Sequence, residues 1–266
     1  MSVSTLEGRV VALTRSEEQN SPVRERLLEL GAQVIAVPTL RFTVAEDLRQ
    51  WTAALEHRDK VTHVVFTSQN SVRFFLKLSD WSGITKAFWL DRRVAAIGER
   101  TAANLADSAL PAHLQAEHST GIGFATELVE RENVGPGSVV LLPQSALAST
   151  DVENFLVAAG ATVLAVPVYE TLPEDSQRAA PLLDALDRGT TVDAIIFASP
   201  SALHAFLELT AQRGRRMLEG NACRIVSIGT TTSRALRDAG LTVAAEAAKP
   251  DTEGLVKAVV GVVGGE

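Results

Sequence analysis

The residues of this chain that could do chemistry are small polar side chains placed just after short apolar runs. The stretch IGTTTSRAL, residues 228–236, has three threonines and a serine directly after a glycine. The junctions of this kind contain Thr14, Arg15, Ser68, Asn70, Gly98, Thr101, Ser199, Ser201, Gly229, Thr230 and Thr231. The phosphate-binding patterns GxGxxG and GxxxxGK[ST] are absent from the chain. We therefore interpret the junctions as helix starts that could bind an anion without a phosphate-binding loop.

A helix start can bind a carboxylate without a lysine, because it presents unpaired backbone N–H groups and a partial positive charge. Each such contact contributes roughly 0.3 to 1 kcal/mol when exposed and up to about 2 kcal/mol when partly buried. The carboxyl ends of parallel strands share one edge of a sheet, so the junctions should converge on one side of each domain. Each residue taken singly could instead be an ordinary N-cap, a position that favours Ser, Thr and Asn.

The composition is that of a globular protein of one large or two modest domains, with 266 residues of which 46% are hydrophobic. A net charge of −7 argues against nonspecific binding to nucleic acid, and an anionic ligand would have to be held locally. The single cysteine, Cys223, excludes an intramolecular disulfide and has no visible activating partner. No apolar targeting core or membrane-length stretch is found, so we expect a cytoplasmic protein without membrane partners.

The chain contains an internal repeat. Residues 8–42 align without gaps onto residues 137–171, with 13 of 35 positions identical. Two later blocks, residues 63–78 and 93–110, match residues 194–209 and 224–241 at a constant offset of 131, as from His63 to Ala194. This self-similarity indicates a duplication, with a two-residue insertion between the blocks.

The repeated unit alternates predicted strands and helices. The runs VVALT, VIAV, HVVF and RVAAI are continuously apolar and of strand length, as is typical of parallel strands covered on both faces. The stretches between them place apolar residues three and four apart, as amphipathic helices do. We therefore predict an α/β protein with two doubly wound, parallel-sheet, flavodoxin-like domains. The runs VIAVPTLRF and VLAVPVYET each carry a proline, which favours a sheet edge or a crossing between domains.

The two copies differ at positions that could matter for function. Thr230 and Thr231 stand where the first copy has Glu99 and Arg100, and Glu99 would repel a carboxylate. Thr232 matches Thr101, so we expect Thr232 to be structural.

The only tyrosine, Tyr169, aligns with Leu40 of the first copy. Its simplest interpretation is an aromatic residue on a linker strand with its hydroxyl in water. A phenol can also donate a hydrogen bond to a departing group, because it stays protonated at neutral pH.

These features together resemble the uroporphyrinogen-III synthase family. The matching segments, in order, are VALTR, LGAQVIAVPTL, VVFTSQNSV, AAIGERTAANL, LLPQ, AAGATVLAVPVYET, IIFASPSAL, SIGTTTSRAL and KPDTEGLVKAV, which span nearly the whole chain. The resemblance implies one domain from residues 1–38 and 172–266 and a second from residues 43–165. It also implies linker strands at residues 39–42 and 166–171, with the active site in a cleft between the domains.

The resemblance further implies a monomeric lyase that closes the linear tetrapyrrole hydroxymethylbilane to uroporphyrinogen III with inversion of ring D. No cofactor or metal is implied, because the pyrroles supply the electrons. In the family, the tyrosine at the position of Tyr169 is thought to assist loss of the ring A hydroxyl, which makes Tyr169 the candidate catalytic residue. The junction residues above are the candidate substrate contacts. Gln144 stands where family members often carry an arginine that would match Arg15.

Two other functions remain open from the residues. A noncatalytic two-lobed module could bind or sense an anionic metabolite, with Gln144 as a sign of relaxed catalytic demand. A two-lobed nucleotide- or sugar-binding enzyme would need a phosphate loop or a catalytic acidic cluster, and neither is evident.

Overall fold

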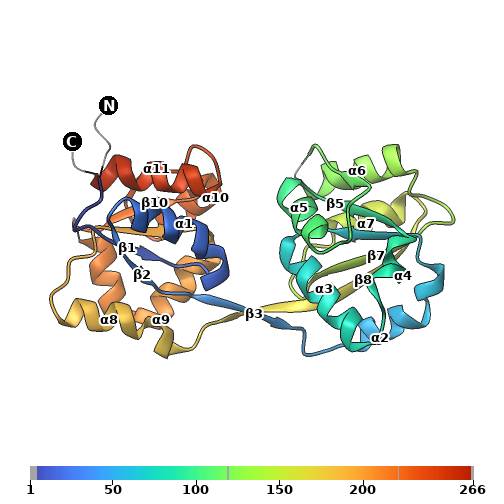
Figure 1. Cartoon of the computed structure of the whole chain (residues 1–266), viewed down its shortest axis with the longest axis horizontal. Helices are drawn as coiled ribbons and strands as arrows, with labels where there is room; N and C mark the ends of the chain where they lie inside the picture. Colours follow the sequence, from blue (N-terminus) through green and yellow to red (C-terminus); the bar gives the residue numbers. More distant parts are fainter. Residues whose placement is uncertain (1–4, 119, 221, 265–266) are drawn as a thin grey trace. The chain divides into compact units, whose positions relative to one another are not determined.

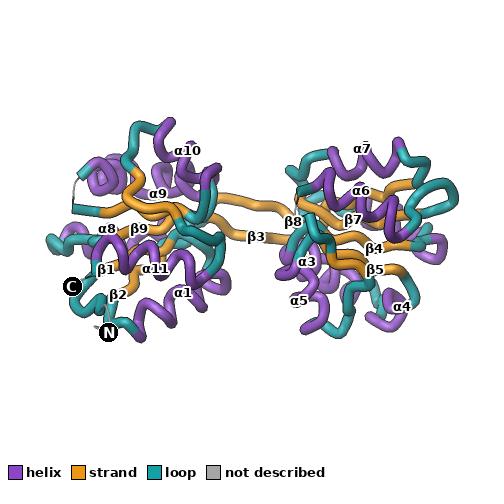
Figure 2. Tube along the Cα trace, turned by 90° about the horizontal axis from the view of Figure 1, so that it is seen from above, coloured by secondary structure: helices purple, strands orange, loops and turns teal. Residues whose placement is uncertain are grey.

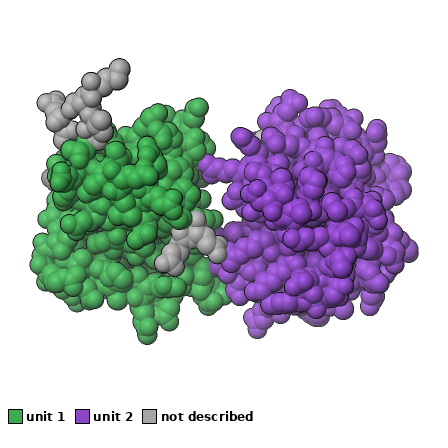
Figure 3. All heavy atoms as spheres, in the orientation of Figure 1, with its two compact units in different colours: residues 1–41, 172–266 green, residues 42–171 purple. Residues whose placement is uncertain are grey.

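The computed structural model describes residues 5–118, 120–220 and 222–264. The chain divides into two compact units, Met1–Arg41 with Leu172–Glu266 and Phe42–Thr171 (Figures 1 and 3). No helix among the described residues is long and apolar enough to cross a bilayer.

The first unit is built on a parallel sheet with the strand order β11-β10-β9-β1-β2. Its strands are β1 (Val10–Leu13), β2 (Gln33–Ala36), β9 (Ala194–Phe197), β10 (Arg224–Ser227) and β11 (Val243–Glu246). Its helices are α1 (Glu17–Glu29), the 3-10 helix η2 (Ser176–Ala179), α8 (Ala180–Asp187), α9 (Pro200–Glu219), α10 (Thr230–Asp238) and α11 (Thr252–Val263). Counted within the unit, this order is 2-1-3-4-5, the order of flavodoxin-like folds.

Helices cover both faces of this sheet, as the continuously apolar strands require. Val10 and Ala12 of β1 pack in a core with residues of α8, α9 and α10, whereas Val11 and Leu13 pack in a second core with α1 and α11. Successive residues of a strand point to opposite faces, so four consecutive buried residues serve both cores. Figure 2 shows α9 and α10 on one side of the strands and α1 and α11 on the other.

The second unit has a six-stranded sheet with the order β3-β8-β7-β4-β5-β6. Its strands are β3 (Leu40–Val44), β4 (His63–Phe66), β5 (Arg93–Ala96), β6 (Leu114–Gln115), β7 (Val139–Ser145) and β8 (Thr162–Pro173). Its helices are α2 (Arg49–Glu56), the 3-10 helix η1 (Arg58–Lys60), α3 (Gln69–Trp81), α4 (Lys86–Leu90), α5 (Glu99–Asp107), α6 (Gly121–Glu132) and α7 (Asp151–Ala158). Without β3, the order repeats that of the first unit, with β7, β8, β4, β5 and β6 in the places of β1, β2, β9, β10 and β11.

The predicted α/β class with parallel sheets is confirmed, and the repeated strand order is consistent with duplication. The proline-bearing runs fall where a missing N–H is tolerated. Pro38 lies between β2 and β3, outside both strands, and Pro167 of β8 pairs with Gln144 where the β7–β8 register shifts. A register shift leaves a backbone group without a ladder partner, so proline removes no regular hydrogen bond there.

The loop after β6 is held by a buried carboxylate on α6. Glu127 accepts hydrogen bonds from the backbone N–H groups of Glu117 and His118, and it contacts His118 Nδ1 at 2.9 Å and Arg131 at 2.7 Å. Burial alone would raise the pKa of Glu127, but these donors together lower the pKa to about 2. The charged form of Glu127 therefore stabilises the folded unit.

We expect Glu127→Gln to lower the free energy of unfolding at neutral pH by about 1 to 3 kcal/mol, because a neutral amide replaces a charged acceptor. The pKa of Glu127 is below its ordinary value of 4.5, so its stabilisation is full above about 4.5 and is lost as the pH falls through about 2. Urea unfolding across this range should show the two proteins converging in acid. The control Glu117→Gln removes an exposed pair with Arg131 and should change stability by less than about 0.5 kcal/mol. An unchanged stability of Glu127→Gln at pH 7 would contradict the assignment.

Candidate functional site at the carboxyl ends of the strands

Two equivalent serines cap the helices that follow β4 and β9. Ser68 and Ser199 have the same backbone angles, φ −162° and ψ 158°. Ser68 Oγ accepts from the Ser71 backbone N–H at 3.0 Å, and Ser199 Oγ accepts from the Ala202 N–H at 3.1 Å. The ordinary N-cap interpretation thus holds for both hydroxyls. Neither first turn carries an acidic residue. The first two N–H groups of α3 have no helical acceptor, whereas α9 begins with Pro200, which has no N–H, and offers that of Ser201.

The helices after β5 and β10 begin instead at glycines. Gly98 and Gly229 are fully extended N-caps, with φ 177° and 172°, and have no side chain to cap the first turn. A Cβ atom added at either glycine would meet no atom within 4 Å, so the approach to the N–H groups is open. The first turn of α5 contains Glu99, whereas that of α10 contains no acidic residue. The start of α10 is therefore the better anion site of the two.

Burial separates the threonines at these junctions. Thr230 and Thr231 are exposed at the start of α10, whereas Thr232 and its counterpart Thr101 are buried. The expected structural role of Thr232 agrees with this burial. The burial of Thr101 indicates a structural role for it as well, and its contact with a ligand stays a prediction.

Thr14 is also a structural residue in this fold. It is 1% exposed, and its hydroxyl donates to the Ile196 carbonyl oxygen at 2.7 Å, which ties β1 to β9. The Thr14 carbonyl oxygen accepts from the backbone N–H and the hydroxyl of Thr39. This burial and this hydrogen bond indicate a structural role for Thr14, and its contact with a ligand stays a prediction.

Three other predicted residues lie at the same edges of their sheets. Arg15 is half-buried after β1, and its Nε donates to Gln19 Oε1 at 3.2 Å. Asn70 is half-buried in the first turn of α3. Ser201 is exposed in the first turn of α9, with its Oγ 3.0 Å from Ser199 Oγ. Their contact with a substrate stays a prediction.

Tyr169 lies on β8, and its hydroxyl is at the start of α3. The residue is 8% exposed, and its hydroxyl oxygen is 3.4 Å from Ser68 Oγ. The Tyr169 ring stacks on Phe74 with a centroid distance of 5.6 Å and meets Phe42 edge-on at 6.1 Å. The ring is thus held on two sides, and the phenol group faces a helix N-terminus rather than only water.

Sequence reasoning missed the aromatic residues around Tyr169. Phe74 and Phe42 align with Ala205 and Thr171, so this aromatic cluster is specific to one copy. This difference between the copies could have identified the aromatic cluster from the sequence.

A second feature missed from sequence is a polar chain beneath the start of α10. The buried Ser227 and Ser233 hydroxyls are 2.6 Å apart, and Ser233 donates to Glu246 at 2.5 Å. This chain ties α10 to β10 and β11. The aligned residues of the other copy are Ala96, Ala102 and Gln115, so only α10 is fixed in this way.

Other candidate chemistries find little support in the described residues. Burial, with Asp193 nearby, raises the pKa of Cys223 to about 12, so its thiol stays protonated at neutral pH. No group of three His, Cys, Asp or Glu residues within residues 5–118, 120–220 and 222–264 is placed to hold a metal ion.

Comparison with known proteins decides the relationship. The model of the family described as "Uroporphyrinogen-III synthase HemD" matches residues 21–257. The chain belongs to the uroporphyrinogen-III synthase family. The uroporphyrinogen-III synthase of Chlorobaculum parvum is 28% identical over 239 residues, which cover 88% of this chain and 91% of that protein.

Solved structures of the uroporphyrinogen-III synthase family share the fold. A mutant enzyme from Thermus thermophilus matches with a TM-score of 0.59 and 19% identity over 94% of this chain and 96% of that one. The Helicobacter pylori enzyme matches with a TM-score of 0.62 and 17% identity over 95% and 99% of the two chains. At these identities the likeness concerns the fold alone, and the role of each residue rests on its own geometry.

Proposed function

We propose that this chain is an active uroporphyrinogen-III synthase, a cyclising lyase that converts hydroxymethylbilane into uroporphyrinogen III. Family membership supports the reaction class. The observation that carries the proposal is the placement of the Tyr169 hydroxyl 3.4 Å from Ser68 Oγ at the start of α3. A proton donor at a helix N-terminus is suited to a reaction that begins by expelling hydroxide.

In the proposed mechanism, Tyr169 donates a hydrogen bond to the hydroxyl that leaves ring A. Loss of this hydroxyl gives an electron-poor azafulvene, which the substituted carbon of ring D attacks. The resulting spiro intermediate fragments and recombines, so that closure leaves ring D inverted. The pyrroles supply the electrons, and the enzyme contributes mainly by holding a flexible chain in one folded pose.

The proposed substrate contacts are the open helix starts. Hydroxymethylbilane carries carboxylate side chains, yet this protein has a net charge of −7. Local backbone donors resolve this conflict, because the first turns of α3, α9 and α10 contain no acidic residue. Ser201, Thr230 and Thr231 are the proposed contacts of the first unit, and Asn70 with Tyr169 of the second.

The deciding experiment supplies freshly made hydroxymethylbilane to the purified protein and separates the product isomers after oxidation. Without an enzyme, closure gives the uninverted isomer I, so an active synthase should produce isomer III in excess. Binding of the substrate with only isomer I as product would instead favour the noncatalytic module. Absence of both binding and turnover would reject both functions.

The double variant Thr230→Ala, Thr231→Ala should raise KM by about two- to fivefold and leave kcat nearly unchanged, because each exposed helix-start contact is weak. Steady-state kinetics of isomer III formation measure the effect. The control Glu99→Ala, Arg100→Ala makes the matching change at the aligned positions and should leave KM unchanged. Unchanged kinetics of the threonine variant would restore the plain N-cap interpretation.

A further inference from the structure

The first unit contains a cavity at the amino ends of its strands. The helix starts described above lie at the opposite, carboxyl ends. Its volume is about 500 Å³, within the range of small-molecule sites. Val192 and Cys223, which line it, come just before β9 and β10, whereas Ser199 and Gly229 follow these strands. In a parallel sheet this order places the cavity at the amino ends of the strands and the proposed substrate contacts at their carboxyl ends.

The internal repeat shows that this place in the fold can be filled. Gly220 lines the cavity and aligns, at the offset of 131 residues, with Trp89 of the second unit. Trp89 is 0% exposed, its ring centroid is 5.0 Å from that of Phe75, and its Nε1 donates to Ser79 Oγ at 3.1 Å. One copy thus packs an indole here, while the other has only a glycine. The hollow is therefore a difference between the copies and not a requirement of the fold.

The helix that supplies part of the cavity wall has an unusual backbone conformation. Within α9, Ala211 has φ 48° and ψ −137°, which breaks the helix just before the cavity-lining residues Arg213 and Met217. Its counterpart Asp80 lies within the helix α3. A positive φ at a residue with a Cβ is strained and persists only where the surroundings impose it. The strain therefore accompanies the hollow copy alone.

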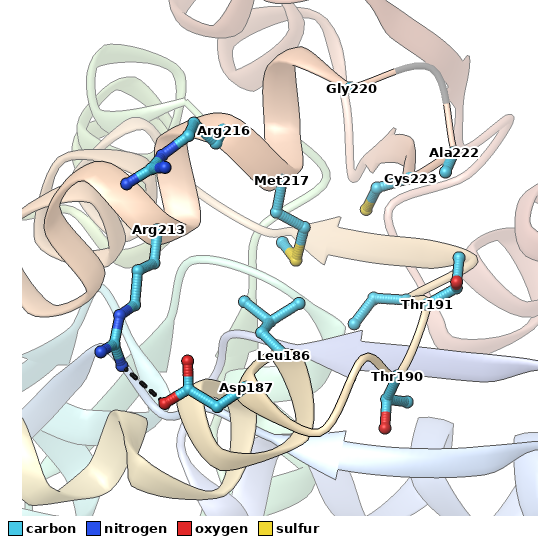
Figure 4. A pocket seen from close by; sticks show the side chains of 11 residues that line it. Leu186, Asp187, Thr190, Thr191, Arg213, Arg216, Met217, Gly220, Ala222 and Cys223 are labelled. Atoms are coloured by element: carbon cyan, nitrogen blue, oxygen red, sulfur yellow. Dashed lines mark hydrogen bonds and ion pairs between the residues drawn. The ribbon is translucent and has the colours of Figure 1, made fainter.

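The lining combines an apolar floor with cationic groups. Leu186 and Met217 point toward each other in the cavity, with the ion pair between Arg213 and Asp187 at one side (Figure 4). Arg213 Nη1 is 3.0 Å from Asp187 Oδ2. Arg216 also lines the cavity, and its Nε donates to the Gln212 carbonyl oxygen at 3.3 Å. No carboxylate pairs with Arg216 among the residues that the structure describes, so its charge remains available.

We propose that this cavity is a second ligand site, which binds a small organic anion with an apolar ring or chain. The apolar body lies against Leu186, Val192 and Met217, and the acid group pairs with Arg216. An apolar floor supplies the affinity, and the guanidinium orients the acid. The site does not depend on the proposed synthase activity, because it lies at the amino ends of the strands, away from the proposed substrate contacts.

The test uses Met217 as a reporter, since the chain has two methionines, Met1 and Met217. Protein labelled with [methyl-13C]methionine is titrated with 2-naphthoate and followed by NMR, with Met217→Leu assigning the signal. The Met217 methyl resonance should shift saturably, and the uncharged 2-naphthamide should bind at least about fivefold more weakly. Absence of a saturable Met217 shift up to millimolar 2-naphthoate would overturn the site. Equal affinity for the amide would overturn its assignment to anions.

Two variants with opposite expected signs test the charge assignment. Arg216→Gln should weaken 2-naphthoate binding about fivefold, whereas Asp187→Asn should tighten it about two- to threefold by freeing Arg213. Arg24→Gln, an exposed change on α1, controls for net charge and should leave the affinity unchanged. Unchanged or tighter binding of 2-naphthoate by Arg216→Gln, or weaker binding by Asp187→Asn, would contradict the assignment of the acid group to Arg216. Arg216 and Asp187 are both exposed, so we expect both variants to fold.

Discussion

Replacing Tyr169 by phenylalanine is expected to lower kcat for uroporphyrinogen III formation by about 10- to 100-fold, while KM changes by less than about twofold. A positioned proton donor contributes typically about 100-fold or more. We expect the lower part of this range because water or Ser68 could replace part of the hydrogen bond. The group acts mainly when charge develops on the leaving oxygen, so its loss should appear in kcat.

The same change should cost less than about 1 kcal/mol of folding stability. Phenylalanine retains the ring that stacks on Phe74 and loses only the contact of 3.4 Å with Ser68. Stopped or quenched assays of isomer III and urea unfolding measure the two quantities. Ser68→Ala is the control: it removes an N-cap, which costs roughly 1 kcal/mol, and should lower kcat less than Tyr169→Phe does. Wild-type turnover by Tyr169→Phe would remove Tyr169 from the mechanism.

Replacing Thr230 by glutamate is expected to raise KM about tenfold or more while slightly stabilising the protein. A carboxylate in the first turn favours the helix by roughly 0.3 to 1 kcal/mol. The same charge would repel a substrate carboxylate at the start of α10, where no acidic residue now stands. A tenfold change in affinity corresponds to about 1.4 kcal/mol, which is comparable to the helix-start contribution with its sign reversed.

The expected effects of Thr230→Glu on stability and on substrate binding have opposite signs, which distinguishes the proposal from a general folding defect. A general folding defect would lower both stability and activity, whereas the proposal requires stability to rise as KM rises. The control is Glu99→Thr, the reverse exchange at the aligned position of α5, which should lose a few tenths of a kcal/mol and leave KM unchanged. An unchanged KM for Thr230→Glu would exclude the start of α10 as a substrate contact. Thermal unfolding and steady-state kinetics supply the measurements.

The strands and helices could be predicted because their signals are local. The short apolar runs HVVF and RVAAI predict buried strands, and they form β4 and β5, whose apolar residues are buried. The repeat strengthened these predictions, because a strand predicted in one copy supported the aligned strand in the other. The same comparison separated the exposed Thr230 and Thr231 from the buried Thr232.

The sequence left the roles of Thr14 and Thr101 undecided for one reason. A hydroxyl residue after a strand suits both a ligand contact and a structural bond, and the residue type does not distinguish them. Thr14 bonds Ile196, a residue 182 positions away, because β1 lies beside β9 in the folded sheet. Only the pairing of strands distant in sequence decides that direction.

The sequence by itself determined the family, the alternation of strands and helices, the repeat, and Tyr169 as the only tyrosine, which aligns with Leu40 of the other copy. These properties depend on residue type, spacing and order along the chain, which the sequence contains directly. The tertiary structure alone decided that Tyr169 lies beside Ser68, 101 positions away, and that Gly220 borders a hollow where Trp89 fills its own unit. Such contacts depend on how side chains from distant segments fill the space between packed elements, and local periodicity carries no information about that space.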